Sequence, residues 1–146
     1  MNQRAEDLKK RTAAFAKLII ELCKKVPATD AGRTMSKQLI EAATSVAANY
    51  RATCRARSHA EFVAKIGTVE EEADECVGWL ELLVSTDTLK PAETEAALAE
   101  AGELTAIFTA SHRTARGRRG ERSGKSPTPE SAVPKSPIPA KSPIPE

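Results

Sequence analysis

The sequence has few of the residues on which enzymes and metalloproteins depend. It contains two histidines in 146 residues, His59 and His112, and neither has a cysteine or carboxylate at the spacing of a metal-ligand motif. A serine or cysteine nucleophile needs a base within hydrogen-bond reach, and two isolated histidines give little support for one. A glycine-rich phosphate-binding loop is also absent. We therefore expect no enzymatic activity, no catalytic, metal-binding or cofactor-binding residues, and no small-molecule substrate.

Cysteines and long apolar runs are equally sparse. Cys23, Cys54 and Cys76 are odd in number and show no Cys-x-x-Cys spacing, which indicates free thiols in a reducing compartment. No apolar run approaches the roughly 20 residues that a membrane-spanning helix needs. The first residues also lack the apolar core of a signal peptide. We expect a cytoplasmic protein with no membrane partner.

Aromatic residues make up only 3% of the chain, whereas alanine is abundant. Strands prefer β-branched and aromatic residues, so this composition favours closely packed helices. Four segments repeat apolar or small residues at alternating spacings of four and three, which places a stripe along one side of a helix, as in left-handed bundles. The stripes are Leu8, Thr12, Phe15, Ile19, Leu22, Val26; Met35, Leu39, Ala42, Val46, Asn49, Thr53; Phe62, Ile66, Val69, Ala73, Cys76, Leu80, Leu83; and Ala97, Ala101, Leu104, Phe108, Ser111.

Turn and capping residues separate these stripes. Residues 27–30 (Pro-Ala-Thr-Asp) end the first segment and offer a cap for the second. Ser58 followed by Glu61 is a capping-box pattern, and Pro91 suits the first turn of a fourth helix. Short joins make successive helices antiparallel. The sequence therefore predicts an all-α protein: one antiparallel, up-down-up-down four-helix bundle over residues 1–115.

The apolar pattern stops at Arg116, where a basic cluster broken by glycines begins. Seven of the nine prolines follow, in near-repeats of Lys-Ser-Pro-Ile-Pro that start at Lys135 and Lys141. Proline removes backbone donors and opposes helix, so residues 116–146 are predicted to form a disordered, polyproline-like tail. Three roles stay open for it: a spacer, a docking peptide, and an electrostatic arm.

Several apolar residues fall beside or away from the four stripes. They are explained either by a broad core face or by a second face that packs against neighbouring subunits. These residues are Leu18, Ile20, Ile40, Ala43, Ala47, Val63, Val77, Leu82, Val84, Leu98 and Ile107.

Charge is segregated along the chain. Residues 1–57 hold 12 Lys/Arg and 5 Asp/Glu, residues 58–112 hold 2 and 12, and residues 113–146 hold 8 and 3. The blocks could pair within or between subunits, or they could present a basic face to a polyanion. Binding to such a face would be phosphate-driven and salt-sensitive, and the lack of interleaved aromatics argues against stacking on single strands. The candidate nucleic-acid-binding residues are Lys24, Lys25, Arg33, Lys37, Arg51, Arg55, Arg57, Arg116, Arg118 and Arg119.

Polar residues at and beside the second and third stripes predict a structural network. Asn49 occupies a stripe position, where a buried amide must find partners. The Trp79 indole wants an acceptor, and Glu72 or Glu75 lies one or two turns back. Arg51 could answer either carboxylate across the bundle, and we expect such pairs to depend on each other.

The same region resembles a known protein family. The residues that carry the resemblance are Asn49-Tyr50-Arg51, Cys54-Arg55-Ala56-Arg57-Ser58, Glu61-Phe62, Lys65, Glu70-Glu71-Glu72, Asp74-Glu75 and Trp79-Leu80. They look like the bacterial four-helix bundle proteins that include those encoded in intervening sequences of large-subunit ribosomal RNA genes. The resemblance covers roughly residues 10 to 112 and implies a bundle with no established enzymatic activity. A related branch, the accessory protein of diversity-generating retroelements, implies a pentamer that binds a reverse transcriptase and nucleic acid.

Together, the pattern and the resemblance predict a non-enzymatic, oligomeric scaffold. We expect a homo-oligomer, with a pentamer among its candidate states, that binds nucleic acid or a ribonucleoprotein through basic surfaces. The alternative is a protein-docking adaptor that acts through its proline-rich tail.

Overall fold

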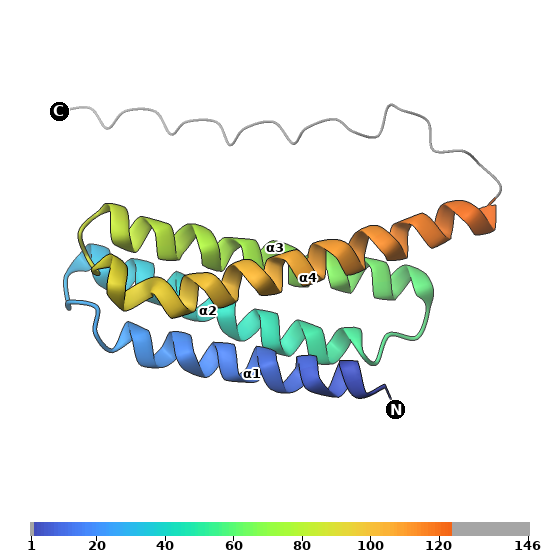
Figure 1. Ribbon diagram of the computed structural model, residues 1–146, viewed down its shortest axis with the longest axis horizontal. Helices are drawn as coiled ribbons and strands as arrows, with labels where there is room; N and C mark the ends of the chain where they lie inside the picture. Colours follow the sequence, from blue (N-terminus) through green and yellow to red (C-terminus); the bar gives the residue numbers. More distant parts are fainter. Residues whose placement is uncertain (1, 124–146) are drawn as a thin grey trace.

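The computed structural model describes residues 2–123, and the side chains of residues 2–117. Four helices follow one another: α1 (Gln3–Cys23), α2 (Asp30–Thr53), α3 (His59–Ser85) and α4 (Pro91–Ser123). Each helix packs antiparallel against the next (Figure 1), and α1 closes the bundle by packing against α4, less extensively than the sequential pairs pack. The predicted up-down-up-down, four-helix bundle is confirmed.

The helices start at residues that satisfy their unpaired amides. The Thr29 hydroxyl accepts from the Gly32 amide at 3.0 Å, so Thr29 is the cap of α2. Ser58 Oγ accepts from the Glu61 amide at 3.1 Å, while Glu61 reaches back to the Arg57 amide at 3.1 Å. The bonds to the Gly32 and Glu61 amides satisfy groups that the first helical turn leaves without a partner, whereas Arg57 lies just before the cap of α3. The capping pattern predicted at Ser58 therefore forms, but the Glu61 carboxylate accepts from the amide of Arg57 and not from that of the cap residue, Ser58.

The core is built from the predicted stripes. In α3, all residues of the stripe from Ile66 to Leu83 are buried, as are the middle residues of the stripes in the other helices. Phe15 and Phe108 are the largest fully buried side chains and supply much of the apolar area removed from water. Thr12 is buried without loss because its hydroxyl donates to the Leu8 carbonyl at 2.9 Å.

The stripes become partly exposed at one end of the bundle. Leu8, Asn49, Phe62 and Ser111 are only partly buried, and all four lie near the end that contains the chain's N-terminus. Tyr50, next to Asn49, takes the buried position instead and packs against Phe108. An aromatic ring covers more apolar surface than an amide, so the interpretation of Asn49 as a buried core residue is wrong. Asn49 donates to the Ser45 carbonyl of its own helix at 2.9 Å.

Helix α4 runs past the boundary drawn at residue 115, and continues to Ser123. It projects beyond the other three helices, toward the right of Figure 1. Arginine and glutamate favour helix strongly enough to carry it through Gly117 and Gly120. The predicted disorder of the tail from residue 124 to 146 lies outside the described residues.

Most of the apolar residues outside the stripes pack against the core. Ile40, Val77, Leu98 and Ile107 are partly buried against it, and Ala43 is fully buried. The large apolar side chains left exposed in the described part of the chain are Leu18, Ile20 and Leu82. A broad core face therefore accounts for much of the surplus.

Candidate nucleic-acid interface

Four chain segments meet at one end of the bundle: the start of α1, the end of α2, the start of α3 and the last turns of α4. This end lies at the right of Figure 1 and includes the N-terminus. Six arginines come from α1, α2, α4 and the turn that joins α2 to α3, and we call the region the arginine end. They are Arg4, Arg51, Arg55, Arg57, Arg113 and Arg116.

All six arginine side chains at the arginine end are exposed. Among residues 2–117, none of the six makes a side-chain ion pair or hydrogen bond. Several follow a helix C-terminus, where the dipole's negative end favours positive charge. That effect explains why arginines are tolerated there, but it leaves their guanidinium donors unused.

Carboxylates near the arginine end already have other partners. Glu61 bonds to the Arg57 amide and lies 3.8 Å from the Lys65 ammonium. Glu6 pairs with Lys9 at 3.0 Å. Asp7 accepts from the neutral Gln3 amide at 2.9 Å and lines a hollow with Arg4, so its charge lies near that guanidinium.

The sequence-predicted basic residues do not form one surface on a single chain. Lys24, Lys25, Arg33 and Lys37 lie at or near the opposite end, beside the α1–α2 turn. Arg33 and Arg51 are 18 residues apart on the same helix, which separates them by about 27 Å. Lys24 pairs with Glu21 at 2.9 Å, and Arg33 lies 3.8 Å from Asp30.

Two arginines at the arginine end were not among the sequence-predicted candidates. Arg4 and Arg113 lie at the same end of the bundle as Arg51 and Arg116 as a consequence of the antiparallel order, which the sequence did predict. Helix order combined with charge could therefore have found them. Arg118 and Arg119, which were predicted, lie within α4, and their side chains fall outside the described part of the chain.

The predicted polar network forms only in part. The Trp79 indole donates to Glu75 at 3.1 Å, as expected for an indole near an acceptor. Arg51 does not reach either carboxylate, because Glu72 lies 13 residues into α3 and about 20 Å from the α2–α3 turn. Burial, with the nearby Glu75 charge, instead raises the pKa of Glu72. A raised pKa is expected for a carboxylate that has no cation beside it.

A polar cluster that the sequence did not suggest joins α3 to α4. Glu70 accepts from the Thr109 hydroxyl at 3.0 Å and contacts His112 Nδ1 at 2.6 Å. The other side of the His112 ring lies against Gly67, where a Cβ would be 3.1 Å from Cε1 and Nε2. Because the imidazole is packed on both sides, the cluster holds two helices together. Its partners lie 39 and 42 residues apart, and no local pattern signals them.

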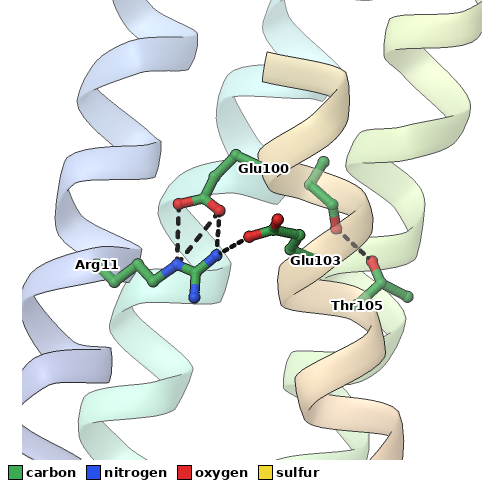
Figure 2. Close-up of polar contacts among 5 residues, drawn as sticks. Arg11, Glu100, Glu103 and Thr105 are labelled. Atoms are coloured by element: carbon green, nitrogen blue, oxygen red, sulfur yellow. Dashed lines mark hydrogen bonds and ion pairs between the residues drawn. The ribbon is translucent and has the colours of Figure 1, made fainter. Parts of the chain in front are cut away.

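A second interhelix cluster joins α1 to α4. Arg11 Nε donates to Glu100 at 3.0 and 3.2 Å, and the same guanidinium bonds to Glu103 (Figure 2). The hydrogen bond to Glu100 is the main reason why the pKa of Arg11 is raised above its usual range. Arg11 therefore pairs with two carboxylates, in contrast to Arg4, two turns earlier on the same helix.

The core opens into hollows beside Arg4. One, which we call the Tyr50 hollow, lies between the start of α1 and the α2–α3 turn. A second, smaller hollow next to it shares Arg4, Phe62 and Ser111 and also includes His59. The His59 ring contacts the Ala115 carbonyl at 2.8 Å and so ties the start of α3 to α4.

Metal-binding clusters and membrane-spanning helices are both absent from the described residues. No group of three or more His, Cys, Asp or Glu side chains in residues 2–117 is placed to hold a metal ion. None of the four helices is both long enough and apolar enough to cross a membrane, as far as the chain is described.

Comparison with known proteins gives a family. The family described as "23S rRNA-intervening sequence protein" matches residues 5–110. A crystal structure of a protein of unknown function from the S23 ribosomal protein family of Bacteroides thetaiotaomicron is 30% identical, with a TM-score of 0.67. The match covers 72% of this chain and 97% of that one. No curated protein matches, and neither name describes an enzymatic activity. The chain belongs to the 23S rRNA-intervening sequence protein family.

Proposed function

We propose that this protein is a non-enzymatic helical bundle that binds the phosphate backbone of RNA through its arginine end. The observation that carries the proposal is the gathering of six exposed arginines, without ion pairs in the described part of the chain, from three helices and a turn. Arginine suits phosphate because its planar group offers paired donors. The family's name mentions 23S rRNA without saying that its members bind it, and we take RNA as the polyanion to test.

Such a surface binds RNA largely independently of the base sequence of the RNA. Phosphate contacts fix position and orientation, and their strength falls as salt rises because counterions are released. Assembly of several copies would multiply the contacts and raise the overall affinity. The exposed Leu18, Ile20 and Leu82 side chains support assembly into a homo-oligomer. A molar mass of a monomer at micromolar concentration, measured by light scattering, would contradict the proposed homo-oligomer.

The test measures the salt dependence of RNA binding. Fluorescence anisotropy of a labelled RNA duplex is recorded from 50 to 200 mM KCl for the native chain and for Arg51→Gln/Arg55→Gln/Arg57→Gln. Because the variant cannot neutralise three of the phosphates, its slope of log K against log salt should be shallower by about 2.7 for a duplex. Over a fourfold range of salt, three neutralised phosphates account for about 40-fold in affinity. Equal slopes for the two proteins would contradict the proposal.

The chain offers a control with the same change in charge. Lys24→Gln/Lys25→Gln/Lys37→Gln also removes three positive charges, but from the opposite end of the bundle. All three lysine side chains are exposed, so their replacement should not disturb the core. The control should keep most of the native slope, whereas an equal decrease in both variants would point to net charge rather than to a site.

A further inference from the structure

The Tyr50 hollow has an apolar floor formed by parts of the core that stay partly open. Tyr50 is 7% exposed and its ring packs against Phe108, with ring centroids 5.4 Å apart and planes tilted by 43°. Phe62 is only partly buried, and Leu8 and Ile66 complete the apolar lining. A hollow with fixed aromatic walls at the mouth of a core is suited to a flat apolar group.

The rim of the Tyr50 hollow is basic. Arg4 approaches from the start of α1 and Arg55 from the α2–α3 turn, and both guanidinium groups are exposed and without ion pairs in residues 2–117. Glu6 also lies on this rim, but Lys9 pairs with it at 3.0 Å. Burial raises the pKa of Tyr50 and keeps its hydroxyl neutral, so the floor adds no negative charge. An anionic ligand with a flat apolar part matches both the rim and the floor.

The volume of the hollow, about 610 Å³, lies within the range of small-molecule sites, roughly 300 to 1,000 Å³. A nucleobase with its ribose and phosphate has the required composition: a flat ring for the aromatic floor and a phosphate for the arginines. Base pairs within a duplex cannot present their faces, so the base must be unpaired.

We propose that the Tyr50 hollow binds one unpaired base of an RNA, with the base against Phe62 and its flanking phosphates on Arg4 and Arg55. This inference rests on the proposed RNA-binding function and adds the class of RNA: a helix with a bulge, a loop or a frayed end. It also gives Phe62 a role that a paired RNA would not use. Aromatic residues are few in the sequence, but the fold brings two of them to the arginine end.

The experiment compares two RNAs of equal charge. Each is the same duplex with a single-nucleotide bulge, which carries adenine in one RNA and an abasic residue in the other. Stacking of one base on an aromatic side chain should make the adenine bulge bind about 5 to 150 times more tightly. The phosphates are the same in both, so the ratio of dissociation constants isolates the base.

Phe62→Leu keeps an apolar side chain and removes the flat ring. It should bring the two dissociation constants to within about threefold of each other, and circular dichroism checks that the variant is folded. A second readout uses the native chain: Cys54 is exposed and lines the hollow, so adenine-bulge RNA should slow its alkylation by iodoacetamide more than abasic RNA does.

Equal affinity for the two RNAs, with Cys54 alkylated at the same rate in both complexes, overturns the inference. If Arg51→Gln/Arg55→Gln/Arg57→Gln shows its shallower slope at the same time, the proposed function stands without the base site. If neither RNA shows salt-dependent binding, the proposed function fails and the base site fails with it.

Discussion

Replacing Gly67 with alanine should destabilise this protein, although alanine is the better helix former. Gly67 lies in the interior of α3, where glycine costs about 0.8 to 1.0 kcal/mol relative to alanine. An alanine Cβ would stand 3.1 Å from two atoms of the His112 ring, closer than such atoms normally approach. The His112 ring must therefore shift to admit the new methyl group.

A shift of His112 by a few tenths of an ångström strains its contact with Glu70. That contact is 2.6 Å long, and Glu70 is held in turn by the Thr109 hydroxyl at 3.0 Å. A hydrogen bond that involves a charged group contributes about 1.5 to 3 kcal/mol. The gain in helix propensity offsets only part of this cost, so Gly67→Ala should lower the free energy of unfolding by about 0.5 to 2 kcal/mol.

Two other glycines provide matched controls. A Cβ built on Gly78 in α3 or on Gly102 in α4 meets nothing within 4 Å. Gly78→Ala and Gly102→Ala should therefore raise the free energy of unfolding by about 0.8 to 1.0 kcal/mol each, from propensity alone. The three variants change the same atoms, so a difference in sign reports the environment of Gly67.

A double-mutant cycle identifies His112 as the cause. In a His112→Ala background the obstacle is gone, and Gly67→Ala should stabilise the chain by about 0.8 to 1.0 kcal/mol. Urea unfolding followed by circular dichroism at 222 nm, at one fixed protein concentration, measures all four corners of the cycle. The reasoning is refuted if Gly67→Ala stabilises the native background, or if its effect is the same in both backgrounds.

Two further predictions concern the interhelix ion pairs and the thiols. Arg11→Gln removes the bonds to Glu100 and Glu103 but leaves partly exposed carboxylates, so it should cost only about 0.5 to 1 kcal/mol in low salt and less in 1 M NaCl, as urea unfolding would show. A decrease of several kcal/mol would contradict this. Burial raises the pKa of the Cys76 thiol to about 12, so a thiol reagent at pH 8 should label the exposed Cys54 and leave Cys76 unlabelled until the chain unfolds. Fast labelling of Cys76 in the folded chain would disprove its burial.

The helices could be predicted from the sequence because their determinants are local. The period of the stripes decides which face is buried, and Ser58, Thr29 and Pro91 mark the helix starts within a few residues of the observed ones. The end of α4 was less predictable. The apolar pattern stops at Arg116, but the helix does not, since backbone bonds and good helix formers continue to Ser123.

The side-chain partners could not be predicted in the same way, because they depend on the register between helices. Residue type suggested Glu72 or Glu75 as the partner of Arg51, whereas Glu72 lies about 20 Å along α3 from the α2–α3 turn, near which Arg51 stands. Glu70 with His112, and Arg11 with Glu100, are pairs separated by 42 and 89 residues. Choosing between Asn49 and Tyr50 for the core needed the position of Phe108, which lies on another helix.

Segregation of charge along the chain left two interpretations open, and the pattern of ion pairs now favours one. If the basic and acidic blocks served mainly to hold the helices together, lysines and arginines should bridge from one helix to another. Within residues 2–117, Arg11 makes the ion pairs that join a lysine or arginine to another helix. The other ion pairs of lysine and arginine join residues three or four positions apart in the sequence. The antiparallel order gathers six arginines at one end, where no described carboxylate pairs with them. Like charges held close together repel, which costs stability. Bound phosphates would relieve such repulsion, which is the physical reason for the proposed polyanionic partner.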